Sequence, residues 1–176
     1  DFGINGNSVS TYGLWLGGQV SPFPATGSIN NLEIKNCVTA GLRLAYAQVV
    51  SIDNCNIISN GRGIESLAGD ENTATSFYRT RSFGNTTEGA YFEQIWGFTF
   101  IQCNFESNGT EGVQIERVDG NTQSGITFQD CWFEDNMDAG GTGGANLFFS
   151  VAGGSSSETS IVKVIGCEFN GINTAA

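Results

Sequence analysis

Residues 126–133 read Ile126-Thr127-Phe128-Gln129-Asp130-Cys131-Trp132-Phe133, a short run of alternating apolar and polar residues that reaches a cysteine and resumes with an aromatic residue. Residues 98–105 repeat this pattern, with Phe100, Cys103 and Phe105 at the matching positions. Alternation with a period of two is typical of a short β-strand with one buried face. The recurrence of the unit indicates an internal repeat, and this repeat decides the fold.

Four further segments fit the same unit. The last residue of each segment is a cysteine, or Arg81 in one case, and successive ones are 18, 26, 22, 28 and 36 residues apart. A period near twenty residues with variable insertions is typical of a solenoid, in which strands of successive coils pair in parallel. We therefore predict an all-β, single-stranded parallel β-helix of about six or seven coils, with loop insertions near residues 67–75 and 138–160. The aligned segments are 32–37, 50–55, 76–81, 98–103, 126–131 and 162–167.

The repeat frame also predicts what fills the interior. Five cysteines lie at or near one inward position, and we expect free, buried thiols because a flat ladder gives poor torsion geometry for a disulfide. Asn60, Asn108 and Asn136 occupy the same position of the repeat, five residues after its cysteine, which predicts a ladder of side-chain amides. Arg81 occupies a cysteine position, so we expect a local register shift or an outward Arg81. The predicted inward columns are Ile34, Ile52, Tyr78, Phe100, Phe128 and Val164, and Ile57, Phe83, Phe105, Phe133 and Phe169.

Composition excludes several classes of function. The 176 residues carry 18 acidic and 7 basic side chains, a formal charge of −11, which argues against a nucleic-acid or anionic-membrane partner. The chain has no histidine, so His-based triads and His-ligated zinc sites are excluded. No apolar run is long enough to span a bilayer, and no calcium-binding acidic cluster is evident. We expect no nucleic-acid partner, no membrane insertion, no metal and no cofactor.

The repeated unit resembles the right-handed parallel β-helix of the pectin-lyase-like superfamily, which includes bacteriophage tailspikes and polysaccharide-degrading enzymes. The resemblance extends from Phe2 to Phe169. It implies a right-handed coil and a polysaccharide partner. We expect one domain over residues 1–176 that is a segment of a longer chain, because repeat-like sequence is under way by Phe2 and the sequence shows no amphipathic helix that could cap the open strand edges. The resemblance is greatest to a tailspike or tail-fibre segment, which implies an extracellular or virion-tail location.

Outward-facing residues of the second strand of each coil form the candidate site. Aromatic rings stack on sugars, and amides and carboxylates bond their hydroxyls. A pair of carboxylates can act as acid and nucleophile, or as acid and base. An ordinary solvated face, with Arg43 paired to Glu65, is the alternative. One column holds Trp15, Arg43, Glu65, Tyr91, Gln114 and Asn146, and the next holds Ala45, Glu93, Glu116 and Phe148.

From this face we select Glu65, Glu93 and Glu116 as candidate catalytic residues and Trp15, Arg43, Tyr91 and Gln114 as candidate substrate-binding residues. Three functions remain open. The first is a tailspike segment that binds, and in one version depolymerises, a bacterial surface polysaccharide. The second is a secreted polysaccharide lyase or glycoside hydrolase, and the third is a non-catalytic structural or adhesin rod.

Outward apolar residues form a further predicted patch. Ile101 and Ile165 are expected to share one column, and Trp132 and Val38 another nearby. Such patches mark interfaces. The resemblance to tailspikes implies a parallel homotrimer, and cover by loops is the alternative.

Overall fold

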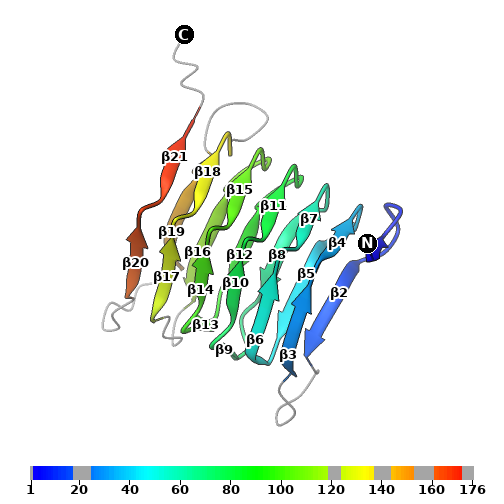
Figure 1. Ribbon diagram of the computed structural model, residues 1–176, viewed down its shortest axis with the longest axis horizontal. Helices are drawn as coiled ribbons and strands as arrows, with labels where there is room; N and C mark the ends of the chain where they lie inside the picture. Colours follow the sequence, from blue (N-terminus) through cyan, green and yellow to red (C-terminus); the bar gives the residue numbers. More distant parts are fainter. Residues whose placement is uncertain (1, 18–24, 119–123, 137–143, 153–160, 172–176) are drawn as a thin grey trace.

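The computed structural model describes residues 2–17, 25–118, 124–136, 144–152 and 161–171. Within these ranges the chain forms short β-strands joined by turns and contains no helix. Three parallel sheets run the length of the molecule, and the chain passes from sheet 1 to sheet 2 to sheet 3 in every coil (Figure 1). The prediction of an all-β parallel solenoid is confirmed.

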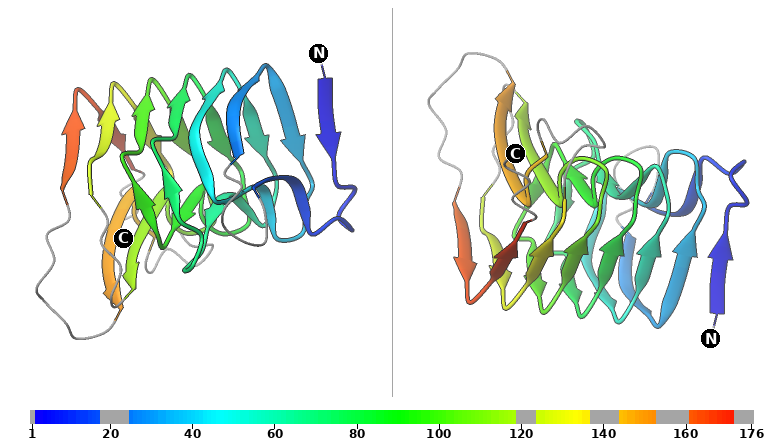
Figure 2. Two further views of the ribbon diagram at one scale, coloured as in Figure 1. Left: turned by 90° about the horizontal axis from the view of Figure 1, so that it is seen from below. Right: turned by 90° about the horizontal axis from the view of Figure 1, so that it is seen from above.

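Strands of successive coils lie side by side along one axis, from β1 at one end to β21 at the other (Figure 2). Sheet 1 contains β1 (Phe2–Asn5), β4 (Leu32–Lys35), β7 (Asn56–Ile58), β11 (Arg81–Phe83), β15 (Asn104–Glu106), β18 (Trp132–Glu134) and β21 (Glu168–Asn170). Sheet 2 contains β2 (Tyr12–Gly17), β5 (Ala40–Ala45), β8 (Arg62–Ser66), β12 (Ala90–Phe92), β16 (Val113–Val118) and β19 (Leu147–Ala152). Sheet 3 contains β3 (Ala25–Asn30), β6 (Ala47–Asp53), β9 (Asn72–Thr73), β10 (Ser76–Tyr78), β13 (Ile95–Trp96), β14 (Thr99–Ile101), β17 (Ile126–Gln129) and β20 (Val162–Ile165).

The core consists of in-register stacks of apolar side chains. Neighbouring rings lie nearly parallel, with centroids 4.7 Å apart for Phe100 and Phe128 and 5.3 Å apart for Phe105 and Phe133. Burial of such rings is the main favourable contribution to folding. The column in sheet 3 is Ile29, Ile52, Phe77, Phe100, Phe128 and Val164, and the column in sheet 1 is Ile4, Ile34, Ile57, Ser82, Phe105, Phe133 and Phe169.

Three predicted core positions are wrong. Phe77 and Ser82 face inward where Tyr78 and Phe83 were expected. Thr80 accepts a hydrogen bond from the Cys55 amide and takes the corner position that the alignment gave to Arg81. The inward residues of this coil therefore each lie one position earlier in the sequence than predicted. A shift of one residue moves every side chain to the other face.

Arg81 consequently faces outward, as anticipated. Its guanidinium bonds Glu106 at 3.0 Å and lies 4.1 Å from the centre of the Phe83 ring. Ile34 is the third misplaced residue, since it pairs with Ile57 in sheet 1 rather than Ile52 in sheet 3.

The asparagine ladder is confirmed and has one more member than predicted. Side-chain amides bond from Asn60 to Asn85 (3.3 Å), from Asn85 to Asn108 (2.8 Å) and from Asn108 to Asn136 (2.8 Å). Each ladder carbonyl oxygen after the first also accepts the backbone amide of the preceding asparagine. All four asparagines are buried, so the ladder satisfies backbone groups at the corner between sheets 1 and 2.

The cysteines are free, as predicted, but they do not all share one column. Cys55, Cys103, Cys131 and Cys167 occupy the corner between sheets 3 and 1, with Thr80 between the first two. Cys37 instead precedes Asn60 in the ladder, and its amide donates to Asn60 Oδ1 at 3.0 Å. Cys167 is half-buried rather than buried, because its coil ends the described stack.

The outward apolar residues only partly follow the prediction. Ile101 and Ile165 share one column on sheet 3, through Gln129. Trp132 lies on sheet 1, whereas Val38 lies at the corner before β5, so they share no column. The error has the same origin as that of Ile34, because residues 32–37 were aligned to the wrong sheet.

The two expected insertions contain strands. β9 lies within residues 67–75, and β19 lies within residues 138–160. Residues 138–143 and 153–160 of the second insertion lie outside the described residues.

Candidate functional site

The outer face of sheet 2 carries the predicted site residues in register. Trp15, Arg43, Glu65, Tyr91 and Gln114 follow one another across β2, β5, β8, β12 and β16. The last member of this column is Phe148, not Asn146, because β19 begins at Leu147 opposite Val113. Asn146 instead accepts a hydrogen bond from the ladder residue Asn136 at 2.8 Å.

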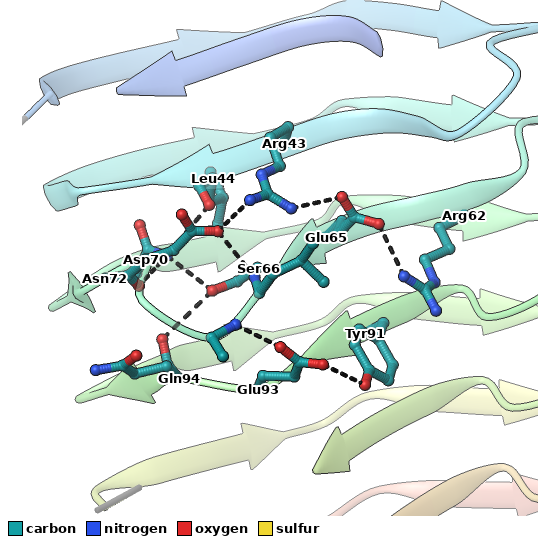
Figure 3. A network of polar contacts seen from close by, with 12 residues as sticks. Arg43, Leu44, Arg62, Glu65, Ser66, Asp70, Asn72, Tyr91, Glu93 and Gln94 are labelled. Carbon is teal, nitrogen blue, oxygen red and sulfur yellow. Dashed lines mark hydrogen bonds and ion pairs between the residues drawn. The ribbon is translucent and has the colours of Figure 1, made fainter. Parts of the chain in front are cut away.

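Two arginines and three carboxylates form a continuous ion-pair network on this face. Figure 3 shows the part of it that contains Arg43, Arg62, Glu65 and Asp70. Arg43 bonds Glu65 at 2.6 Å and Asp70 at 2.5 Å. Arg62 bonds the other oxygen of Glu65 at 2.8 Å and Glu88 at 2.8 Å. Glu65 is only 1% exposed, and both of its oxygens are in ion pairs. Breaking a buried pair of this kind leaves an uncompensated charge, so the network fixes the geometry of its neighbours.

A tight turn at residues 67–70 packs against this network. The Leu67 amide donates to Asp70 Oδ2 at 2.9 Å, the Ala68 amide donates to Glu93 Oε2, and the Gly69 amide donates to Gln94 Oε1 at 2.7 Å. Gly69 has a φ of +86°, a conformation that residues with a Cβ rarely adopt. Burial raises the pKa of the Asp70 carboxyl, and the Leu67 amide and Arg43 oppose that rise.

Tyr91 joins two carboxylates from adjacent coils. Its hydroxyl lies 2.7 Å from Glu93 Oε1 and 2.7 Å from Glu116 Oε2. Gln114 donates from Nε2 to the same Glu116 oxygen at 3.3 Å. The guanidinium of Arg62 lies 4.0 Å from the centre of the Tyr91 ring and covers one of its faces. We refer to Glu93, Tyr91 and Glu116 as the triad.

The Tyr91 hydroxyl lies within hydrogen-bond distance of both carboxylates. A tyrosine hydroxyl carries one proton, so it donates to one carboxylate at a time. Burial, together with Glu116 and Glu93, raises the pKa of Tyr91 well above its ordinary value, so the hydroxyl stays protonated at neutral pH.

A model of the family described as "Right handed beta helix region" matches residues 5–176. The chain belongs to this family. The β-helix is also similar to the crystal structure of the periplasmic alginate epimerase AlgG, with a TM-score of 0.60 and 13% sequence identity. That likeness covers 95% of this chain and 38% of the epimerase, and at this identity it shows the fold alone. No curated protein matches the sequence.

The β-helix brings together some predicted site residues and separates others. Tyr91, Glu93, Gln114 and Glu116 form one hydrogen-bonded cluster, in which Tyr91 is 7% exposed and the other three are half-buried. Arg43 and Glu65 are buried in the ion-pair network. Trp15 is 43% exposed and lies three strands from Tyr91 in the same column.

Four participants were missed by sequence reasoning: Arg62, Asp70, Glu88 and Gln94. A signal for two of them is present in the repeat, because Gly63 and Gly89 stack at one position of sheet 2 and Arg62 and Glu88 precede them. The contacts of Asp70 and Gln94 depend on the turn at residues 67–70, which breaks the repeat and has no counterpart in the frame.

Among the described residues no three His, Cys, Asp or Glu side chains are grouped so that they could hold a metal ion. The described part of the β-helix likewise has no helix long and apolar enough to span a membrane.

Proposed function

We propose that this β-helix binds a polysaccharide along the outer face of sheet 2 and cleaves it at the triad. The observation that carries the proposal is the single Tyr91 hydroxyl held 2.7 Å from both Glu93 and Glu116. Two carboxyl groups with one proton between them are the components of glycoside hydrolysis. The fold shared with a polysaccharide-modifying epimerase supports the substrate class.

The spacing of the two carboxylates favours the retaining form of the reaction. Two 2.7 Å hydrogen bonds to one hydroxyl keep the bonded oxygens within about 5.4 Å of each other. Retaining glycosidases hold their two carboxyl groups about 5–5.5 Å apart, whereas inverting enzymes need about 6.5–9.5 Å to admit a water. The upper limit on the distance between the bonded oxygens lies below the separation that inverting enzymes need, which supports the retaining form.

We assign Glu93 as the general acid and Glu116 as the nucleophile. Glu93 protonates the glycosidic oxygen while Glu116 attacks the anomeric carbon and forms a glycosyl ester, and the leaving sugar departs as an alcohol. Glu93, now a carboxylate, then takes a proton from water, which displaces Glu116 from the sugar. Tyr91 and Gln114 position Glu116 through their hydrogen bonds. Glu65, with both oxygens in ion pairs, positions Arg62 over Tyr91.

Exposed aromatic rings supply the binding surface. Trp15 and Phe148 are 43% and 41% exposed and lie in the same outward column as Tyr91, on opposite sides of it. Aromatic rings stack on the apolar faces of sugars. A glycan that runs along the rod axis therefore contacts both rings and passes the triad. Tyr91 itself is not a stacking residue, because it is buried and Arg62 covers its ring.

A non-catalytic rod is the second candidate. The burial of Tyr91 and Glu65 favours it, since both side chains already have partners within the protein. The finer assignment to a phage tailspike, outside the cell in a virion tail and as a homotrimer, is also a proposal, and the exposed Ile165 on sheet 3 supports an interface there. The coding sequence on either side of these 176 residues tests it: a virion-attachment domain there supports the tailspike, and a secretion leader supports a secreted enzyme.

The experiment measures the release of reducing ends from a panel of bacterial surface polysaccharides by the wild type, Glu93→Gln and Glu111→Gln. Glu111 is a matched control because it lies in the turn before β16, outside the triad. Loss of the catalytic proton is expected to lower turnover by about 10²–10⁴-fold in Glu93→Gln with binding retained, and Glu111→Gln should keep its activity. Binding without any reducing ends from the wild type supports the non-catalytic rod, and equal turnover in all three proteins contradicts the triad.

A further inference from the structure

Trp96 is an aromatic residue close to the triad that the proposed reaction does not use. It ends β13, which begins the sheet 3 side of the coil two residues after β12. Ile95 before it is buried and Trp96 is half-buried, so strand alternation turns the indole outward. Trp96 pairs in register with Thr73 of one neighbouring coil and with Ser124 of the other.

The indole of Trp96 is open to a ligand. Its N–H group makes no hydrogen bond within the described structure, and the buried polar atoms that lack a partner there belong to other residues. The N–H group of Trp96 is therefore at the surface. The indole of Trp132, in contrast, donates to Glu134 Oε2 at 3.0 Å. An outward ring with a free N–H group offers an apolar face and a hydrogen-bond donor together, which suits a sugar ring and its hydroxyls.

The connection between the triad and Trp96 is short and low. Three residues of chain span at most about 11 Å, which limits the distance from the Cα atom of Glu93 to that of Trp96. The two residues between them, Gln94 and Ile95, are buried, so neither projects from the surface. In the preceding coil the matching connection between β8 and β9 is the longer segment 67–71, which contains the tight turn.

Trp96 lies to one side of the line of exposed rings. Trp15 and Phe148 belong to the outward column of sheet 2, which passes through Tyr91 along the rod axis. Trp96 is on the coil of Tyr91 but beyond the end of β12, so a glycan chain that follows the column does not pass over it. A sugar that reaches Trp96 has to leave the main chain close to the triad.

We propose that Trp96 binds a side-branch sugar, so that the substrate is a branched polysaccharide cleaved next to a branch point. This inference rests on the proposed function, because the main chain must follow the outer face of sheet 2. The indole stacks on the branch sugar, and its N–H group donates to a sugar oxygen. Thr73 and Ser124, on strands about 4.8 Å to either side, add two hydroxyl groups that can bond the same sugar. A linear glycan leaves this subsite empty.

Affinity electrophoresis with paired polymers tests the dependence on branches. The branched probes are guar galactomannan, scleroglucan and arabinoxylan, and their unbranched counterparts with the same main chains are mannan, curdlan and linear xylan. The proteins are the wild type, Trp96→Ala, Trp96→Tyr and Trp132→Ala. Trp132→Ala is the matched control, since this tryptophan is also half-buried and faces outward but lies on sheet 1.

In at least one pair the wild type should bind the branched polymer about 2–10-fold more tightly than the linear one, which is the range for one aromatic contact. Trp96→Ala should lose this advantage and bind the linear polymer as the wild type does. Trp96→Tyr, which keeps a ring, and Trp132→Ala should retain the advantage. The fluorescence of Trp96, measured as the difference between the wild type and Trp96→Tyr, should be protected from acrylamide by the branched polymer only. This measurement keeps the test valid if Trp96→Ala does not fold.

Three results overturn the inference and leave the proposed function standing on the binding of linear polymers. The first is equal binding of both members of every pair. The second is an advantage that survives in Trp96→Ala or is lost equally in Trp132→Ala, and the third is equal protection of Trp96 by both polymers. Absence of retardation by every polymer contradicts the proposed function itself, and the inference falls with it.

Discussion

The hydroxyl of Tyr91 on β12 lies 2.7 Å from Glu116 Oε2 on β16, so this hydrogen bond links one coil of the solenoid to the next. Stacking in register makes the contact possible, because Tyr91 pairs directly with Gln114, which lies two residues before Glu116 on β16. The repeat therefore creates the site as well as the core. Glu93 follows directly after β12, and its Oε1 lies 2.7 Å from the same hydroxyl.

The ionisation of Tyr91 gives a direct test of this environment. Burial and the neighbouring carboxylates raise the pKa of Tyr91, so its hydroxyl should ionise at a higher pH than an ordinary tyrosine. In a titration of tyrosinate absorbance at 295 nm, the difference between the wild type and Tyr91→Phe should therefore appear at a higher pH than the signal of the other tyrosines. A difference of one tyrosinate equivalent that appears near pH 10 would show that Tyr91 titrates normally.

The same shift predicts how stability depends on pH. Because the folded-state pKa of Tyr91 lies above the unfolded value of about 10, its contribution is complete below pH 10 and is lost as pH rises further. The wild type should therefore lose more stability than Tyr91→Phe between pH 9 and about pH 11, as measured by urea unfolding.

The exposed rings of the face should contribute to glycan affinity. Trp15→Ala and Phe148→Ala are each expected to weaken polysaccharide binding by about 0.5–1.5 kcal/mol, because a stacking surface is lost. Ile165→Ala is the control, since Ile165 is also an exposed apolar residue (51%) but lies on sheet 3. Affinity electrophoresis compares the three variants. If both aromatic variants bind as the control does, the glycan does not follow this column.

Two phenylalanines of sheet 1 should differ in their effect on stability, because Phe105 faces the core and Phe83 faces outward. Phe105 is buried between Phe100 and Phe133, and Phe105→Ala should lower the free energy of unfolding by about 3–5 kcal/mol. Phe83 faces outward beneath the Arg81 guanidinium, and Phe83→Ala should cost less than about 1.5 kcal/mol. Urea unfolding measures both values. A larger loss for Phe83→Ala would mean that Phe83, and not Ser82, occupies the core column.

The repeat made most of the core predictable from sequence. Phe100, Phe128, Phe105 and Phe133 recur at one spacing from a cysteine, and only a stack of parallel strands buries all of them. The ladder of Asn60, Asn108 and Asn136 followed from the same frame. Asn85 was missed because its coil had been aligned on Arg81 instead of Thr80, which displaced the expected position by one residue.

The site was predictable only in part, for a physical reason. Outward positions of sheet 2 follow from strand alternation, so Tyr91, Glu93, Gln114 and Glu116 could be grouped in advance. Sequence alternation does not show what covers a face. The turn that brings Asp70 onto Arg43, and the guanidinium of Arg62 that covers Tyr91, both depend on tertiary contacts.

The anomeric configuration of the first sugar released tests whether Glu93 and Glu116 act as acid and nucleophile. Proton NMR can follow the new reducing end from the moment the wild-type β-helix is mixed with a polysaccharide that it binds. Retention of configuration is expected, because the two oxygens that share the Tyr91 hydroxyl lie within about 5.4 Å of each other. An inverted product, an unsaturated sugar end or the absence of any new reducing end would contradict it.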